Sequence, residues 1–378
     1  MPEPILPESP TPQPNRRTVL GAGLGVAAVA VVGTAATPLA AHAAPSEAYP
    51  WIIDCDTWGA RPPAGELPLS AIPTNKIILH HMAFPNVTDY SREQAIKLAR
   101  DCQDLHMDGN GWSDTGQHFT ISRGGYVLEG RRGSLAQLDT GGNQVISAHC
   151  PGENGRSIGI EHEGTYITDV PPEALLDSAV RLCVAICEQY DLHAWDTFGH
   201  WDFRATQCPG ITFYGLFPGL RRKIARKLGE TTMDQARRWP DLWRFVGGPG
   251  VATVQYLLNH RGYQLTTDGV FGPLTVTAVQ DWQSRNGLPV DVDATMTPPT
   301  WETLAPELRL GATGPAVSGV QSILAIKGFG TTITGSYDST TAGAVRKLQR
   351  LHRLPPDGVM TPSTWCALVG GSVRETFR

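Results

Sequence analysis

The sequence lacks an excess of basic charge and, for most of its length, a long apolar run. Its 378 residues include 31 Lys and Arg against 36 Asp and Glu, for a formal net charge of -5 at pH 7. A mildly acidic protein has no electrostatic attraction for a phosphate backbone, so nucleic acid is not an expected partner. Outside the stretch that begins at Leu20, no segment is apolar enough to span a bilayer. The charge thus gives no reason to expect nucleic-acid binding. No membrane span is expected outside the stretch that begins at Leu20.

The apolar stretch itself has the features of an export signal. Arg16 and Arg17 precede the small, uncharged residues 20–32, and Ala-His-Ala at 41–43 provides an A-x-A cleavage site. Paired arginines before such a run are typical of the twin-arginine route. We therefore predict that residues 1–43 are a removed signal peptide rather than a membrane anchor, and that the protein is secreted.

Cysteine is scarce, and its count is odd. An exported protein normally pairs its cysteines, so seven of them leave at least one unpaired, for which Cys208 is the candidate. Cys183 and Cys187 lie on one helical face and are too constrained to pair readily with each other. Their connectivity stays open, and Cys366 is expected to be a buried thiol. The remaining partners to consider are Cys55, Cys102 and Cys150.

A repeat organises the C-terminal third of the chain. The first copy is assigned to residues 245–306 and the second to 312–372. The shared positions are Val254-Gln255, Gly262, Phe271, Trp282-Gln283 and Leu288-Pro289, which recur 66 residues later as Val320-Gln321, Gly328, Tyr337, Leu348-Gln349 and Leu354-Pro355. Apolar stripes ended by glycine predict small three-helix units. Units of this size have little core, so each is expected to lean on its neighbour and to act as a spacer or a binding module.

Residues 49–230 predict a separate α+β domain with a mixed central sheet flanked by helices. "NKIILHHM" reads as a buried strand, and "GQHFTISRGGYVLEGR" as two strands around the turn at 123–125. A helix is expected to begin at Ser91, with Gln94 placed for a capping box and a stripe that reaches Leu105 and His106. A second helix is expected after the prolines at 171–172. Helices mixed irregularly with strands favour this class.

Several residues of this domain could bind a metal ion. His80 and His81 are neighbours on a predicted strand and point to opposite faces, so only one of them can serve a given site. A catalytic zinc site needs three protein ligands and one open position, which two imidazoles and a thiolate would satisfy. Most of the candidates are therefore expected to be structural or surface residues. The candidates are His80, His81, His106, His118, His149, His162, His193, His200 and Cys208.

Five ordered blocks resemble a known enzyme family. They are "WGARPP", "IILHHMAFPNVTDYSR", "GWSDTGQHFTISRGGYVLEGR", "SAHCPGENGRSIGIEHEGTY" and "FGHWDFRATQCPG". Together, over about residues 51–220, they are similar to the zinc-dependent N-acetylmuramoyl-L-alanine amidases, which include phage amidase lysozymes and animal peptidoglycan recognition proteins. The C-terminal copies resemble the peptidoglycan-binding helical repeat of cell-wall hydrolases. The second copy lacks the Asp-Gly found at 268–269, which raises the alternative that it binds poorly or only serves as a scaffold.

The resemblance implies a set of metal ligands and a general base. His80, His200 and Cys208 match the ligands of Zn²⁺, and a metal-held thiolate would explain why Cys208 escapes pairing. Phage and animal members carry a tyrosine where this chain has Gln117. "SIGIEHEG" instead resembles bacterial amidases whose catalytic glutamate is the first of the two, here Glu161. Glu163 would share a strand face with Glu161, and two like charges there predict a raised pKa for one of them, which suits a general base.

The resemblance also implies residues that touch the substrate. Thr206 matches a lysine or threonine position and could donate to an oxyanion. His149 matches a groove histidine, Asn154 is a further groove candidate, and Gln117 lies in the same groove.

The implied function is zinc-dependent hydrolysis of the amide between N-acetylmuramic acid and L-alanine of the peptidoglycan stem, at the cell wall. Two alternatives remain: a non-catalytic peptidoglycan recognition protein, and a cysteine peptidase with Cys208 as nucleophile and His200 as base. The sequence does not indicate an oligomeric state.

Overall fold

A computed structural model of the chain describes residues 46–230 and 233–377. The predicted signal peptide at 1–43 lies outside the described residues. None of the helices in the described part of the chain is both long and apolar enough to cross a membrane.

A mixed sheet forms the centre of the first domain. Its strands are β1 (Ile52–Ile53), β2 (Lys76–His81), β3 (Phe119–Ile121), β4 (Val127–Glu129), β5 (Ser157–His162) and β6 (Thr197–Gly199). They lie in the order β1-β4-β3-β5-β2-β6, and neighbours are parallel except the antiparallel pair β3 and β4. This confirms the predicted α+β class, the buried strand in "NKIILHHM" and the strand pair around the turn at 123–125.

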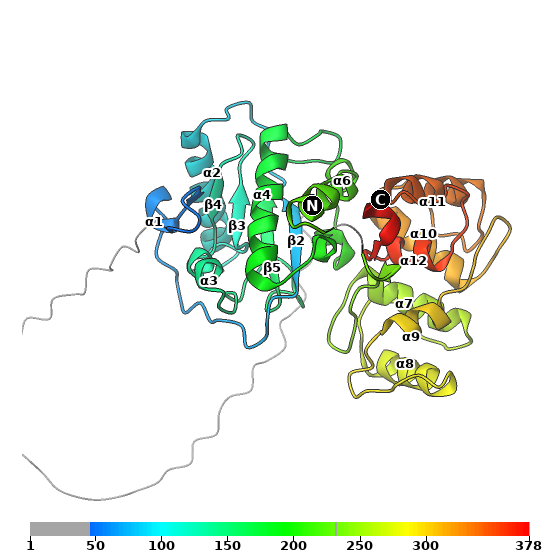
Figure 1. Cartoon of the computed structure of the whole chain (residues 1–378). Coiled ribbons are helices and arrows are strands. Elements are labelled where there is room, and N and C mark those ends of the chain that lie inside the picture. Colours follow the sequence, from blue (N-terminus) through cyan, green and yellow to red (C-terminus); the bar gives the residue numbers. More distant parts are fainter. Residues whose placement is uncertain (1–45, 231–232, 378) are drawn as a thin grey trace, which may run out of the picture. The chain divides into compact units, whose positions relative to one another are not determined.

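Helices cover both faces of this sheet. They are α1 (Cys55–Trp58), α2 (Arg92–Asp104), η1 (Leu105–Gly109), α3 (Ser134–Thr140), α4 (Glu173–Tyr190), η2 (Ala194–Asp196), η3 (His200–Asp202), α5 (Ile211–Tyr214) and α6 (Phe217–Lys227). Helix α4 runs across one face (Figure 1), and its Leu182 belongs to the same buried cluster as Ile77 and Leu79 of β2. Helices α1 and α2 cover β4 on the opposite face, where Trp58 packs with Leu128. The site described below lies on this second face.

The start of α2 matches its prediction, but its end does not. Ser91 Oγ accepts a hydrogen bond from the Gln94 amide at 3.1 Å, as an N-cap should. The Gln94 side chain, however, donates to Glu163 Oε1 at 3.1 Å rather than completing the predicted capping box. The predicted stripe is wrong at its last two residues, because η1 is a π-helical turn that changes the period. Leu105 is 48% exposed there, and His106 is turned toward the site.

The cysteines contradict the expectation of disulfides. All seven are buried, unpaired thiols. Cys183 and Cys187 face the core from α4 and pack there as small apolar groups instead of reaching another cysteine. Cys366 is a buried thiol, as predicted.

The C-terminal repeats form one helical unit. Their helices are α7 (Pro249–His260), α8 (Pro273–Arg285), α9 (Pro298–Leu304), α10 (Pro315–Ile326), α11 (Ser339–Leu351) and α12 (Pro362–Leu368). Val254 of α7 and its equivalent Val320 of α10 belong to a single buried cluster. The two helices pack closely because Gly319 has no side chain: a Cβ there would lie 2.9 Å from Tyr256 Cβ. The expectation that each copy leans on the other is confirmed.

One glutamine in each repeat holds an equivalent turn. In the first copy, Gln255 donates to Asp268 Oδ1 at 2.8 Å and accepts from Gly269 N at 2.9 Å. In the second, Gln321 donates to Thr334 Oγ1 at 3.0 Å and accepts from the amide of the next residue, a glycine, at 2.9 Å. A Thr-Gly turn thus replaces the missing Asp-Gly turn with the same bonds.

The repeats and the sheet domain belong to one compact unit of the chain. The segment between them and the chain's last segment form a two-stranded ladder, β7 (Arg237–Arg238) with β8 (Ser372–Val373), followed by η4 (Arg374–Phe377). Within this unit, Lys327 of the second repeat forms an ion pair with Asp202 of the sheet domain.

Candidate metal and catalytic site

Three neighbouring parallel strands, β5, β2 and β6, end at the same edge of the sheet. His80 and Glu161 are the penultimate residues of β2 and β5, and they are paired in register. His200 follows β6 directly, at the start of η3. Side chains alternate along a strand, so His80 and Glu161 point to the face opposite the one that carries Ile77 and α4. The carboxyl ends of parallel strands are where α/β proteins commonly bind ligands.

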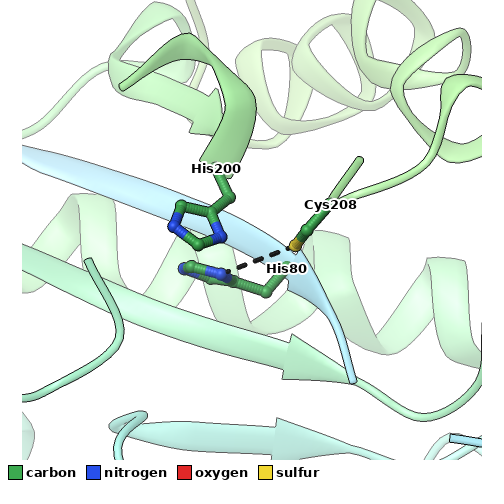
Figure 2. A group of neighbouring side chains, drawn as sticks. All are labelled: His80, His200 and Cys208. Carbon is green, nitrogen blue, oxygen red and sulfur yellow. Dashed lines mark hydrogen bonds between the residues drawn. The ribbon is translucent and has the colours of Figure 1, made fainter. Parts of the chain in front are cut away.

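Cys208 reaches this edge from the loop that follows η3. Its Sγ lies 3.7 Å from His80 Nδ1, and one ligand atom from each of His80, His200 and Cys208 lies within 4.8 Å of the other two. Figure 2 shows the two rings and the sulfur gathered together. The loop is closed by the Trp201 amide, which donates to the Cys208 carbonyl at 3.0 Å. The three residues predicted as metal ligands are therefore brought together by the fold.

This donor set fits a tetrahedral metal ion. Metal–nitrogen bonds of about 2.0 Å and metal–sulfur bonds of about 2.3 Å place ligand atoms roughly 3.3–3.6 Å apart, close to the 3.7 Å between His80 Nδ1 and Cys208 Sγ. His200 Nε2 is buried and has no hydrogen-bond partner among the described residues. Burial lowers the pKa of His200 to about 4, which keeps the imidazole in its neutral, ligating form. Burial also raises the pKa of Cys208 well above its usual range, so the thiol needs an adjacent cation to lose its proton.

His149 orients His80. Its Nδ1 lies 2.9 Å from His80 Nε2, and its Nε2 lies 3.2 Å from Ser157 Oγ. Ser157 Oγ in turn donates to the Glu153 carbonyl at 2.8 Å. Gly159 leaves room for the ring, because a Cβ there would lie 2.3 Å from His149 Cδ2. The structure thus places His149, predicted to touch substrate, against a metal-site residue.

Glu161 lies beside the cluster with a raised pKa. Its Oε1 is 3.7 Å from His80 Nδ1, and its side chain is 17% exposed. Its Oε2 has no hydrogen-bond partner among the described residues. Burial raises the pKa of Glu161 to about 8. A carboxyl group whose pKa lies near neutral pH can both accept a proton and return it.

The predicted cause of this shift is wrong. Burial raises the pKa, not the second carboxylate of "EHEG". Glu163 lies beyond the end of β5, where its carboxylate accepts hydrogen bonds from the Arg123 amide at 2.7 Å and from Gln94 Nε2 at 3.1 Å. These bonds hold Glu163 in a structural role at the start of α2.

Thr206 and Gln117 both line the cavity beside the cluster. Thr206 Oγ1 accepts from the Cys208 amide at 3.2 Å, which leaves its own proton to donate into the cavity. Gln117 is 1% exposed, and its amide nitrogen donates to Thr120 Oγ1 at 2.8 Å. The hydroxyl is therefore available to a ligand, whereas the amide is engaged with β3.

Asn154 does not lie in this cavity. Its Oδ1 accepts from the Cys150 amide at 2.8 Å and from Ser147 Oγ at 3.3 Å. The side chain closes a turn, so its expected place in the groove is not what the structure shows.

Two further histidines illustrate the structural roles expected for most of the candidates. His81 Nδ1 accepts from the Tyr166 amide at 3.1 Å, while the backbone amide of His81 donates to Cys208 Sγ at 3.4 Å. His118 Nδ1 accepts from the Gly159 amide at 2.9 Å, and its Nε2 faces the Val145 carbonyl at 2.8 Å. Both rings are held by backbone groups.

The cluster opens into a cavity of about 250 Å³. Its wall includes His106 and Trp112, whose ring centroids are 4.7 Å apart, and Gly116, whose amide donates to His106 Nδ1 at 3.0 Å. Sequence reasoning missed Trp112 because no spacing in the sequence links it to the cluster: turn η1 brings it there. A larger cavity of about 480 Å³, around Trp195 and Arg238, includes none of the three metal-site residues. The smaller cavity is therefore the candidate functional site, because it contains the three metal-site residues.

The fold and the site define a multidomain protein of the amidase and peptidoglycan-recognition class. Residues 70–211 match the family described as N-acetylmuramoyl-L-alanine amidase, and residues 247–304 and 313–368 each match the peptidoglycan binding domain. The chain therefore contains a domain of this amidase family, followed by two peptidoglycan-binding-domain repeats.

Individual proteins are similar to part of this chain. The chain is 34% identical over 160 residues to peptidoglycan-recognition protein LB of Drosophila melanogaster, covering 42% of this chain and 64% of the fly protein. It is 31% identical over 167 residues to the N-acetylmuramoyl-L-alanine amidase of Sus scrofa, covering 42% of this chain and 25% of the pig protein. Among solved structures, wild-type Drosophila PGRP-LB is 33% identical, with a TM-score of 0.38 and coverage of 44% of this chain and 91% of that one. The match thus spans less than two thirds of the length of either curated relative.

Proposed function

We propose that this chain is a zinc-dependent amidase that hydrolyses the bond between N-acetylmuramic acid and L-alanine in peptidoglycan. The observation that carries the proposal is the convergence of His80, His200 and Cys208 on one cavity, with Glu161 beside them. Two imidazoles and one thiolate leave a fourth position open, as in catalytic zinc sites. The family supplies the substrate class.

The residues around the cluster suit amide hydrolysis. Zinc, when bound, would supply Lewis acidity that polarises the lactyl carbonyl and lowers the pKa of water to about 7. Glu161 takes one proton from the attacking water and returns it to the amide nitrogen as the C–N bond breaks. The products are a lactyl carboxylate and a free L-alanine amino group. Thr206 donates a hydrogen bond to the carbonyl oxygen as negative charge develops, a contribution typically of about 3 kcal/mol.

The repeats support a location at the cell wall. Two copies of a peptidoglycan binding domain on one chain would hold the site near an insoluble polymer and raise its effective concentration there. We therefore propose peptidoglycan as the partner and the cell wall as the location, reached by twin-arginine export.

A recognition protein without catalysis is the second candidate. The observation that favours it is Gln117, which stands where phage and animal relatives carry a tyrosine and which is bonded to Thr120. A cysteine peptidase is disfavoured, because burial raises the pKa of Cys208 whereas a nucleophile needs a thiolate.

The deciding experiment measures release of L-alanine amino termini from purified peptidoglycan by the chain lacking residues 1–43. Zinc content is assayed in parallel for this chain and for Cys208→Ala. We expect about one zinc per chain, new amino termini, and loss of both in the variant. Peptidoglycan that is bound but never cut, with zinc in place, would establish the recognition protein instead.

A further inference from the structure

The loop that carries two of the three metal-site residues is held by the second repeat. Lys327 is the C-cap of α10, and its Nζ lies 2.6 Å from Asp202 Oδ1. The two side chains are 0% and 2% exposed, so the ion pair is fully buried. Asp202 is the last residue of η3, the short helix that begins with His200.

Asp202 connects this ion pair to the backbone on the other side of His200. Its Oδ2 accepts a hydrogen bond from the Gly199 amide at 2.9 Å. Its Oδ1 also accepts from Tyr214 Oη at 3.0 Å, and Lys327 Nζ lies 3.3 Å from the same hydroxyl. One carboxylate therefore fixes the backbone that presents the His200 ring.

Close backbone contacts hold the same loop from two further positions. A Cβ at Gly248, at the start of α7, would lie 1.7 Å from the Phe203 carbonyl oxygen. A Cβ at Gly370, after α12, would lie 2.7 Å from Asp202 Cβ. Both glycines have positive φ, 119° and 93°, where a side chain would also be strained. Segments from both repeats thus lie directly against the loop.

The ion pair makes this arrangement strongly dependent on Lys327. Burial alone would lower the pKa of Lys327, but Asp202 and Tyr214 outweigh burial and raise it, so the ammonium stays charged. A buried carboxylate that loses the ammonium paired with it is left desolvated, which is far more costly than losing a surface pair.

We propose that Lys327 of the second repeat is a positioning residue for the metal site: through Asp202 it holds the backbone at 199–204 so that His200 and Cys208 converge. This rests on the proposed function and extends it, because the second repeat then acts on the metal site as well as on the wall. Hydrogen-bonded groups behind metal ligands commonly change metal affinity by about 10–100-fold.

Zinc affinity of the chain lacking residues 1–43 tests this proposal, measured by competition with a chromophoric chelator. Lys327→Met is expected to bind zinc about tenfold more weakly than wild type. Lys347→Met, the same change at an exposed lysine of the same repeat, is expected to leave affinity unchanged. The double variant Lys327→Met with Asp202→Asn buries no net charge, so it replaces the single variant if that one does not fold. The double variant is also expected to bind zinc about tenfold more weakly than wild type. Affinity within about twofold of wild type in either folded variant overturns the proposal.

Hydrogen exchange of the unmutated chain provides an independent test of the proposed role of Lys327. If zinc binding at the loop and docking of the second repeat are coupled, each stabilises the other to the same degree. Added zinc is expected to slow amide exchange at 199–208 and also at the C-terminal turn of α10. Slowing confined to the loop would overturn the proposal.

The two failures are distinguishable. A wild-type chain that takes up no zinc removes the proposed function and this inference with it. A wild-type chain that binds zinc, beside a Lys327→Met variant that binds equally well, removes only this inference.

Discussion

The Nε2 atom of His80 lies 2.9 Å from Nδ1 of His149, and this contact decides which nitrogen of His80 faces Cys208. One proton must lie between the two rings. If His80 carries it on Nε2, then His80 Nδ1 is free to ligate, and it is the nitrogen 3.7 Å from the Cys208 sulfur. His149 Nε2–H then donates to Ser157 Oγ. The tautomer of a ligand is thus set by a residue that does not ligate.

Gly159→Ala should disturb the contact between His149 and His80. The new Cβ would lie 2.3–2.7 Å from three atoms of the His149 ring, so the ring must shift from its position against His80. We expect zinc affinity to fall about tenfold and stability to fall by about 1–3 kcal/mol. Gly155→Ala is the control, since its nearest neighbour would be Ser70 Oγ at 3.8 Å. Equal zinc affinity in the two variants would show that His149 does not orient His80.

Glu161→Gln should strongly reduce turnover without removing zinc. An amide cannot accept the proton of the attacking water, so we expect kcat to fall about 10³-fold, within the usual range for a lost general base. The exposed Glu93→Gln is the matched control and should keep full activity. Amino-terminus release and zinc content are measured together. Substantial activity in Glu161→Gln would assign the proton transfer to another group.

Chelation should abolish the proposed amidase activity reversibly. We expect a strong chelator to remove both zinc and activity from the chain lacking residues 1–43, and equimolar zinc to restore them. Alkylation should be slow while zinc is bound, because Cys208 is buried and metal-held. Activity that survives chelation but is lost on alkylation would favour the cysteine-peptidase mechanism.

Gln255→Met and Gln321→Met should destabilise the repeats to a similar degree. Each glutamine donates to a turn residue and accepts from the glycine amide that follows it. Methionine keeps the length but leaves these buried groups unpaired, at a cost of about 1–3 kcal/mol. Chemical denaturation measures the change, with the exposed Gln264→Met as control. A much smaller effect for Gln321 would mean that the Thr-Gly turn is not equivalent to the Asp-Gly turn.

His352 should make the repeats less stable in acid. Burial lowers its pKa to about 3, with Arg221 and Lys327 adding to the effect, whereas an unfolded histidine titrates near 6.5. Between these pH values the unfolded chain binds a proton that the folded chain does not. The contribution of neutral His352 to the free energy of unfolding is therefore complete above pH 6.5 and declines toward pH 3. The slope from this residue is at most about 1.4 kcal/mol per pH unit. Denaturation of His352→Leu between pH 6.5 and 4.5 should show a shallower decline, and identical slopes would contradict it.

Local patterns in the sequence were enough to predict the elements that carry the site. The apolar run before His80 predicts a buried strand, and alternation along it separates His80 from His81. The 66-residue repeat predicts two small helical copies that share a core. The order of five motifs indicates a resemblance to the amidase family, which the family match over residues 70–211 supports.

Other features depended on contacts that local patterns do not encode. Pairing of the cysteines failed as a prediction because a disulfide requires two sulfurs to meet, and burial against apolar neighbours satisfies them here instead. The pKa of Glu161 is raised by burial rather than by Glu163, whose carboxylate is held at the start of α2. The role of Asn154 also depends on the folded loop, which brings the Cys150 amide to its side chain and makes it a turn residue.

The sequence by itself determined the periodicities, the repeat and the residue types that can bind a metal, because these are properties of neighbours along the chain. Only the tertiary structure decided that the carboxyl ends of β2, β5 and β6 bring His80, Glu161 and His200 together, and that Lys327 reaches Asp202 from 125 residues away. Such contacts depend on how whole elements pack, and no local spacing carries that information.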